Sequence, residues 1–270
     1  MISKKVVIIT GASSGIGLAC SKEFSNRGYG VVMSSRNLEQ LRTLEQELKK
    51  GNPDILAIKV DVSIEDDCKT LIDETIKHFG RIDVLINNAG ISMRALFNDV
   101  DLNVLHSLMN TNFWGSVYCT KYSLPHILEQ KGSVVGVSSI AGFMGLPGRT
   151  GYSASKFALQ GFLETIRIEY RQQKLHVMVV APGFTASNIR NSALIADGSK
   201  QGESPRDENK MMTSEKVAYY IYKGVVKRKR QIVLTTQGKL AVLLRKFFPE
   251  LIDYFEFLEM SKEANSPLKK

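Results

Sequence analysis

The chain is poor in cysteine and histidine, and neither residue type is spaced as a metal site or a disulfide framework requires. Its 270 residues include three cysteines (Cys20, Cys68 and Cys119) and four dispersed histidines, with no C-x-x-C pair. An odd number of scattered cysteines is typical of a chain kept in a reducing compartment, where thiols fill space in the core. We therefore predict no disulfide and no bound metal.

Long apolar runs are also missing. No stretch reaches the ~20 residues that a membrane-spanning helix needs, and the first predicted strand begins almost at Met1, which argues against a secretory leader. Hydrophobic residues make up 43% of the chain and charged residues 23%, which is ordinary for a globular protein. We expect a cytoplasmic protein whose residues 1–270 form a single domain.

The formal charge of +9 is distributed unevenly. Residues 216–270 contain 12 Lys or Arg against 5 Asp or Glu, a net charge of +7, and residues 227–230 read Lys-Arg-Lys-Arg. Such a run can attract anionic lipid or nucleic acid, or it can be a solvated helix end whose cations complement the helix dipole. No aromatic residues interleave with it and no nucleic-acid motif accompanies it, so we favour the helix end and expect no nucleic-acid partner.

Predicted strands and helices alternate along the chain. This order indicates an α/β fold of the Rossmann type: a doubly wound parallel sheet of about seven strands with helices on both faces. Apolar runs predict strands near residues 5–10, 30–35, 55–61, 82–87, 133–138, 176–181 and 231–235. Helical periodicity predicts helices near residues 15–27, 37–50, 64–79, 101–130 (as one helix or two), 152–173, 214–227 and 238–258.

A glycine-rich turn follows the first predicted strand. Residues 10–17 read TGASSGIG and lead directly into the first helix. Backbone N–H groups and the positive end of a helix dipole at such a turn bind a pyrophosphate, and glycines let the backbone approach it closely. The spacing G-x-x-x-G-x-G differs from the usual dinucleotide fingerprint. The alternative is a tight strand–helix turn without a ligand.

Tyr152 and Lys156 lie four residues apart at the start of a predicted helix. Residues at this spacing share one helix face. An ammonium close to a phenol lowers the tyrosine pKa from ~10 toward neutrality, so that the phenol can exchange a proton with an alcohol or carbonyl oxygen. The alternative is a Tyr–Lys pair on a solvated helix face, where the spacing is common.

Several motifs occur in a fixed order. They are Gly11, Gly15 and Gly17; Asp61-Val62; Asn87 to Gly90; Asn112; Ser138-Ser139; Tyr152 with Lys156; and Pro182-Gly183. With these motifs the chain resembles the short-chain dehydrogenase/reductase family, up to about residue 235. The resemblance is strongest to its single-domain carbonyl reductases and hydroxysteroid-type dehydrogenases. It implies an oxidoreductase that transfers a hydride between a nicotinamide cofactor and a carbonyl or secondary alcohol.

The resemblance implies a cofactor site built from several loops. The glycine turn would hold the pyrophosphate. Asp61 and Val62 would contact the adenine, and the segment that begins at Pro182 would contact the nicotinamide carboxamide. The family commonly has Thr where Ser187 stands, so either Thr185 or Ser187 would make that last contact. The expected cofactor residues are Gly11, Ser13, Ser14, Gly15, Ile16, Gly17, Ser35, Arg36, Asp61, Val62, Asn88, Ala89, Gly90, Tyr152, Lys156, Pro182, Gly183 and Thr185.

The end of the second strand favours NADP(H) over NAD(H). Ser35 stands where NAD-preferring members of the family carry Asp, and Arg36 follows it. An acidic residue there binds the ribose hydroxyls, whereas a guanidinium clamps a 2′-phosphate. Ser14 stands where some NADP-preferring members carry a second basic residue, and Arg36 can alternatively stack on the adenine without touching the phosphate.

The resemblance also assigns four catalytic residues. Tyr152 would be the acid in reduction and the base in oxidation, and Lys156 would lower its pKa and bind the nicotinamide ribose. Ser139 would hydrogen-bond the substrate oxygen, with Ser138 as the competing serine. Asn112 would hold a water linked to Lys156, or would only kink or cap a helix. A cofactor sensor without turnover is a second hypothesis, although a sensor has no need of a tuned phenol.

Expected substrate-pocket residues are mostly apolar, which favours an apolar or amphipathic carbonyl compound. Besides Ser139 they include Met93, Phe143 and Phe184. Residues near 187–213 would form a lid over the substrate, and within it residues 196–210 show no apolar periodicity and read as a mobile loop.

The C-terminal part predicts an amphipathic helix near residues 238–258, bent or restarted at Pro249, followed by a frayed polar tail from residue 261. The helix would pack on the domain or on a neighbouring subunit. Peripheral docking on a membrane is the alternative that we favour less, since basic residues flank the helix. By analogy with the family, we expect a homodimer or homotetramer that associates through the helices before and at the Tyr–Lys pair.

Overall fold

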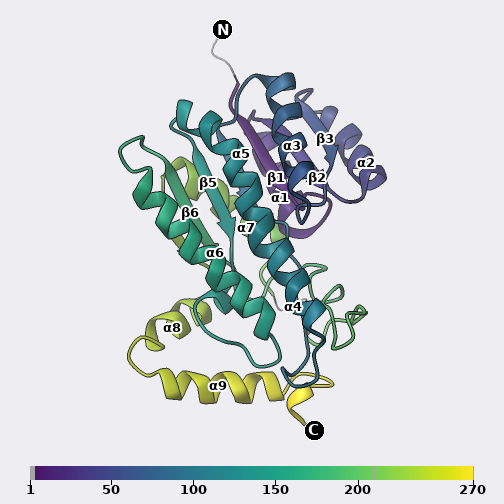
Figure 1. The fold of residues 1–270 in the computed structure, drawn as a ribbon, viewed down its shortest axis with the longest axis vertical. Helices are drawn as coiled ribbons and strands as arrows, with labels where there is room; N and C mark the ends of the chain where they lie inside the picture. The colour runs from purple at the N-terminus through teal and green to yellow at the C-terminus, as the bar shows by residue number, and fades with distance from the viewer. Residues whose placement is uncertain (1–3, 209–210, 270) are drawn as a thin grey trace.

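The computed structural model describes residues 4–208 and 211–269 (Figure 1). Seven strands form one sheet in the order β3-β2-β1-β4-β5-β6-β7, and every neighbouring pair is parallel. The predicted fold class is confirmed. The strands are β1 (Val6–Thr10), β2 (Gly30–Ser35), β3 (Ile55–Lys59), β4 (Val84–Asn87), β5 (Ser133–Val137), β6 (His176–Ala181) and β7 (Gln231–Val233).

Both faces of the sheet are covered by helices, as the alternating order predicted. One apolar core lies between the sheet and α1 (Gly15–Asn26), α2 (Leu38–Lys49) and α7 (Ser214–Val226). The other lies between the sheet and α3 (Glu65–Phe79), α5 (Gly115–Glu129) and α6 (Thr150–Glu169). Along β1, Val7 and Ile9 enter the first core while Val6 and Ile8 enter the second. Burying each such side chain stabilises the fold by about 1.5–3 kcal/mol.

The predicted long helix over residues 101–130 is interrupted by a π-helical turn. α4 (Leu102–Met109) ends where η1 (Asn110–Trp114) begins, and α5 continues from Gly115. Asn112 lies in this wider turn, and its buried amide accepts from the Ile91 N–H at 2.8 Å and donates to the Ile91 carbonyl at 3.0 Å. A π turn inside an α-helix often marks a functional position, and here it brings an asparagine against the loop after β4.

The C-terminal helix is two helices. α8 (Thr236–Leu244) and α9 (Pro249–Ser261) are separated at the predicted proline, which opens α9. Figure 1 shows the pair at the end of the molecule opposite the N-terminus. The apolar side chains that the pair exposes are Leu240, Leu243, Phe247, Phe248, Leu251, Tyr254, Phe255 and Phe257.

The basic run at residues 227–230 follows α7 and lies at the other end of β7 from α8. Within it, the Arg228 side chain donates to the carbonyl of Lys131 at 2.9 Å and also to that of Lys174. The run is therefore a helix end that closes two neighbouring loops. Among the described residues, no helix is both long enough and apolar enough to cross a membrane.

Residues 262–269, which follow α9, do not fray, so the prediction of a frayed tail was wrong for them. Glu263 and Ser266 are buried, and the Ser266 hydroxyl donates to the Met260 carbonyl at 2.8 Å. A short 3-10 helix, η4 (Pro267–Lys269), ends the described chain. The sequence pattern missed this order because the tail has no apolar periodicity and is held by ion pairs to distant arginines.

Candidate active site

A cavity of about 810 Å³ opens where the parallel strands end. Ligands bind at this edge of doubly wound sheets, next to the point where the strand order reverses. Seventeen of the eighteen expected cofactor residues line it, the exception being Gly17. Of the four expected catalytic residues, Ser139, Tyr152 and Lys156 line the cavity and Asn112 does not. The structure thus brings together loops that are far apart in the sequence.

The glycine turn leaves the start of α1 open toward the cavity. Gly11 and Gly15 have φ angles of +66° and +52°, a backbone conformation that glycine adopts at little cost. Ser14 precedes α1 and its side chain makes no capping hydrogen bond, whereas Asn37 caps the next helix. The first N–H groups of α1 therefore remain available to an anion. These residues fit a pyrophosphate.

Gly17 does not line the cavity, but it lets α1 pack closely against the glycine turn. A Cβ atom added to it would lie 2.2 Å from the Gly11 carbonyl oxygen and 2.6 Å from Asn88 Nδ2. The Asn88 amide itself donates to the carbonyls of Thr10 at 2.9 Å and Gly11 at 3.2 Å. Asn88 thus fixes the turn from the loop after β4. Sequence reasoning missed Thr10, whose hydroxyl accepts the N–H groups of Asn88 and Ala89, each at 3.0 Å.

The adenosine end of the expected site contains Asp61 and Arg36. Asp61 Oδ1 accepts from the Ser63 N–H at 3.0 Å and its hydroxyl at 2.7 Å, which shapes the turn into α3. Asp61 also lines the cavity, so a structural role and a binding role are compatible. Arg36 is exposed on the cavity wall, and no described residue forms a hydrogen bond or ion pair with its guanidinium.

Lys156 lies one helical turn after Tyr152 and is 3% exposed. Its ammonium donates to the Val137 carbonyl at 2.9 Å and lies 5.7 Å from the centre of the Tyr152 ring. Burial lowers the pKa of Lys156 to about 8, because the charged form loses hydration. The start of α6 at Thr150 places both side chains on the cavity wall.

Burial raises the pKa of Tyr152 above its ordinary value, while a hydrogen bond with Ser139 and the charges of Arg149 and Arg190 act in the opposite direction. The predicted lowering by Lys156 was wrong for this structure. The ammonium bonds to Val137 rather than to the phenol oxygen, and desolvation of the phenolate is the largest effect. The phenol is therefore protonated at neutral pH.

The structure favours Ser139 over Ser138 as the serine that faces the reacting oxygen. Ser138 is buried, accepts from Gln160 Nε2 at 3.1 Å and donates to the Lys156 carbonyl at 3.5 Å. Ser139 begins η2 (Ile140–Gly142), where its hydroxyl accepts from the Ala141 N–H at 3.2 Å, and it bonds to Tyr152. Of these two serines, Ser139 is therefore the one that interacts with the phenol.

Asn112 lies close to Lys156 but is engaged elsewhere. Besides its bonds to Ile91, its amide donates to the Ser155 hydroxyl at 2.9 Å. A Cβ on Gly90 would lie 3.1 Å from Asn112 Oδ1 and 3.4 Å from Lys156 Nζ, so the Gly90 backbone passes beside both groups. These contacts suit the helix-kink interpretation, and the predicted water link remains a hypothesis.

Two of the expected pocket residues do not line the cavity. Met93 is fully buried, and its sulfur accepts from the Gly151 N–H at 3.2 Å, so it packs against the first turn of α6. Phe143 also lies outside the lining, whereas Phe184 and Ser139 form part of it. An apolar residue near an active-site loop was the only sequence signal for the first two, and such a residue packs equally well behind the wall.

The segment after β6 borders the cavity, as expected for a lid, but it is not without fixed contacts. Leu194 donates to the Ser92 carbonyl at 2.8 Å and its own carbonyl accepts from the Arg94 N–H at 2.7 Å. Arg190 donates to the Thr185 carbonyl at 2.7 Å and to Glu208 at 2.8 Å. Polar side chains therefore fix a segment in which the sequence shows no periodicity.

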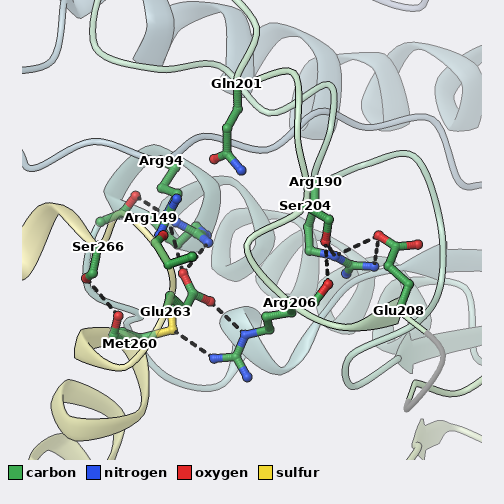
Figure 2. Close-up of polar contacts among 12 residues, drawn as sticks. Arg94, Arg149, Arg190, Gln201, Ser204, Arg206, Glu208, Met260, Glu263 and Ser266 are labelled. Atoms are coloured by element: carbon green, nitrogen blue, oxygen red, sulfur yellow. Dashed lines mark hydrogen bonds and ion pairs between the residues drawn. The ribbon is translucent and has the colours of Figure 1, made fainter.

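Sequence reasoning missed the charged part of the wall. Residues from α8, α9 and the tail line the cavity, namely Gln237, Gly238, Ala241, Glu256, Met260 and Glu263. Figure 2 shows Arg94, Arg149 and Arg206 converging on Glu263. The wall is therefore less apolar than predicted. The local signal was Arg149 itself, three residues before Tyr152, whereas nothing near Glu263 indicated its place.

Known proteins resemble this chain over most of its length. The family described as short chain dehydrogenase matches residues 5–196. An 11-beta-hydroxysteroid dehydrogenase A of Arachis hypogaea is 35% identical over 264 residues, which cover 94% of this chain and 74% of the relative. Dehydrogenase/reductase SDR family member 7B of Mus musculus is 34% identical over 267 residues, covering 97% and 83%.

Solved structures share the fold. A short chain dehydrogenase/reductase from Burkholderia phymatum in complex with NAD has a TM-score of 0.82 at 22% identity, covering 93% of this chain and 96% of that one. An alcohol dehydrogenase from Thermococcus sibiricus complexed with 5-hydroxy-NADP has a TM-score of 0.75 at 20% identity, covering 86% and 96%. Together with the family match and the curated relatives, these findings show that the chain belongs to the short-chain dehydrogenase/reductase family, whose members are nucleotide-binding oxidoreductases.

Proposed function

We propose that the protein is an NADP(H)-dependent oxidoreductase that interconverts a carbonyl and a secondary alcohol, with Tyr152 as the acid/base. The observation that carries the proposal is one continuous cavity. It contains the open N-terminus of α1 and, in the same lining, the Tyr152 phenol bonded to Ser139. A protein that only senses the cofactor has no use for a half-buried phenol that interacts with a serine and lies beside an ammonium.

The residues divide the work of reduction between them. A bound nicotinamide cofactor would supply the hydride for the carbonyl carbon. Tyr152 donates its phenolic proton to the carbonyl oxygen, and Ser139 holds that oxygen by a hydrogen bond. In oxidation Tyr152 takes the proton back. The phenol is protonated at neutral pH, which is the form that donates a proton in reduction.

The choice of NADP(H) rests on Arg36. The similar structures hold an NADP derivative in one case and NAD in the other, so they do not decide between the two cofactors. Arg36 is exposed on the cavity wall beside Ser35, with no acidic residue in the place where an NAD-binding carboxylate would stand. A guanidinium that has no other partner in residues 4–208 and 211–269 is suited to a 2′-phosphate.

We propose an amphipathic carbonyl compound as the substrate. Several relatives are named hydroxysteroid dehydrogenases, and the cavity combines apolar residues such as Ile189, Leu194 and Phe184 with polar and charged ones. We also propose a homo-oligomer through α5 and α6, because Trp114, the last residue of η1 before α5, and Phe157 and Ile168, on α6, are exposed. Sedimentation of Phe157→Glu beside the control Phe255→Glu tests this: only the first should dissociate the assembly.

The proposed activity is tested by NADPH oxidation with purified protein and a panel of ketones, aldehydes, quinones and steroid-like carbonyls. Tyr152→Phe should abolish turnover while NADPH still binds, as measured by its fluorescence. Tyr220→Phe, a change on the partly exposed face of α7, is the matched control and should be fully active. Tight NADPH binding without turnover of any compound would favour a sensor, and equal activity in Tyr152→Phe would refute the mechanism.

A further inference from the structure

We propose that Arg149 binds an anionic group of the substrate, a carboxylate, close to the reacting carbonyl. This inference rests on the proposed function and narrows its substrate to a keto acid or the corresponding hydroxy acid. It starts from the charged part of the cavity wall, formed by the residue before α6, the segment after β6 and the C-terminal segment (Figure 2).

That part of the wall has an excess of positive charge. Its charged residues are Arg149, Arg190, Lys200, Glu256 and Glu263. Their ion-pair partners add Arg94, Arg206 and Glu208. The set contains five cations and three carboxylates, but Lys200 is exposed to water, so the four arginines and three carboxylates that remain leave one positive charge away from bulk water. Uncompensated cations with little access to water are costly, and an anionic ligand would offset that cost.

Arg149 is the arginine with the weakest contacts. Its side chain is 12% exposed, and its nearest polar contacts are Glu263 Oε2 at 3.4 Å and the carbonyl of the preceding Gly148 at 3.5 Å. By contrast, Arg206 Nε lies 2.7 Å from Glu263. A guanidinium has five N–H donors, so Arg149 keeps donors for a further acceptor.

Arg94, the second arginine paired loosely with Glu263, is not part of the cavity lining. The Arg94 side chain is 7% exposed, and its Nε has no hydrogen-bond partner in the described part of the chain, lying only within ion-pair range of Glu263 at 3.4 Å. Glu263 is thus shared by three arginines, of which Arg206 lies 2.7 Å from it while Arg94 and Arg149 each lie 3.4 Å away. The cluster has more donors than acceptors.

The position of Arg149 determines where a bound anion would lie. The residue precedes α6 directly, three residues before Tyr152, and both side chains line the cavity. The two groups are close enough for the Arg149 charge to act on the phenol. Because Arg149 lies so close to Tyr152, a carboxylate bound to Arg149 belongs to the same molecule as the carbonyl that receives the Tyr152 proton. A planar carboxylate suits this place, since it accepts from a guanidinium through two oxygens.

Glu263 has a defined part in this arrangement. Its carboxylate, from the tail after α9, holds Arg149 loosely and competes with a substrate carboxylate for it. Removing that charge should strengthen acid binding, whereas removing the Arg149 charge should weaken it. The two changes therefore have opposite expected signs, which a general loss of folding does not produce.

The test uses keto acids whose carboxylate lies one to four carbons from the ketone, each paired with its methyl ester, with NADPH as the reductant. We expect kcat/KM of the wild type to be at least about tenfold higher for the best acid than for its ester, about the difference that one charge-assisted pair makes. Arg149→Gln should lower kcat/KM for the acid more than for its ester, so that the preference disappears, and Glu263→Gln should lower KM for the acid. Arg171→Gln, an exposed change, is the control.

A binding measurement separates this inference from the proposed function. Calorimetric titration of the Tyr152→Phe protein with NADPH bound compares the acid with its ester without turnover. Tighter binding of the acid, lost in Tyr152→Phe with Arg149→Gln, supports the anion site even where the wild type turns over neither. Turnover of esters in preference to acids would overturn the anion site and leave the oxidoreductase intact. Equal loss for acid and ester in Arg149→Gln, or no acid binding, would also overturn it.

Discussion

Lys156 Nζ and the Val137 carbonyl oxygen are 2.9 Å apart, and this hydrogen bond ties the first turns of α6 to the end of β5. The bond holds an almost fully buried ammonium on the cavity wall. The charge is retained beside Tyr152 at a cost in stability, which can be measured because it depends on pH.

The first prediction concerns this pH dependence. Burial lowers the pKa of Lys156 to about 8, whereas an unfolded lysine has a pKa of ~10.4. Below pH 8 both states carry the proton and the folded state bears the full desolvation cost. As pH rises from about 8 to about 10.4, the unfolded state binds more protons than the folded one, so stability rises.

The measurement compares urea unfolding of the wild type and Lys156→Met across that range. The wild type should gain roughly 3 kcal/mol relative to the variant between pH 8 and pH 10.5. Lys121→Met, a change at an exposed position on α5, should track the wild type. A constant difference between wild type and Lys156→Met would mean that Lys156 is not desolvated.

The second prediction concerns the packing of the glycine turn. Because a Cβ on Gly17 would lie 2.2 Å from the Gly11 carbonyl oxygen, Gly17→Ala must push α1 away from the turn. We expect a loss of roughly 2–4 kcal/mol in the free energy of unfolding, together with weaker NADPH binding.

Gly161 provides the matched control, since it lies inside α6 and a Cβ there would meet no atom within 4 Å. Gly161→Ala should stabilise the protein by about 0.5–1 kcal/mol, because alanine loses less backbone entropy in a helix. Thermal unfolding of both variants checks the pair. Similar shifts in the same direction would refute the packing argument.

Sequence patterns were sufficient for elements that are defined locally. Runs of valine and isoleucine marked all seven strands within a few residues, and the glycine turn and the Tyr152–Lys156 pair were visible as spacings. The direction of the Tyr152 pKa shift was not visible in the sequence, since it depends on burial by distant segments. Glu263 lies 169 positions from Arg94 in the sequence, and only the fold brings the two within ion-pair range at 3.4 Å.

The third prediction distinguishes two roles of Asn112. Its amide makes hydrogen bonds to both backbone groups of Ile91 and to the Ser155 hydroxyl. Asn112→Ala leaves these buried partners unsatisfied, which costs about 1–3 kcal/mol for each group that water cannot reach. We therefore expect a marked drop in melting temperature, with Asn103→Ala on the exposed face of α4 as the unaffected control. An unchanged melting temperature with lost activity would instead favour the predicted water link.

The fourth prediction concerns the cofactor. Arg36 lines the cavity next to Ser35 without another partner among the described residues. Arg36→Asp removes a charge-assisted contact to a 2′-phosphate, worth about 1.5–3 kcal/mol, and adds repulsion. The Kd for NADPH should rise by roughly 10- to 100-fold or more, while the Kd for NADH should fall or stay constant, because an aspartate at this point accepts from the ribose hydroxyls.

Arg42→Asp is the control for this change, because it makes the same change of charge on an exposed position of α2 outside the cavity lining. Long-range repulsion alone would weaken NADPH binding in both variants, and the effect would fade with added salt. A direct contact at Arg36 predicts that only Arg36→Asp exchanges the preference and that the exchange persists at high salt. Fluorescence titration with both cofactors separates the outcomes, and an unchanged NADPH to NADH ratio in Arg36→Asp would mean that Arg36 stacks on the adenine without contacting the phosphate.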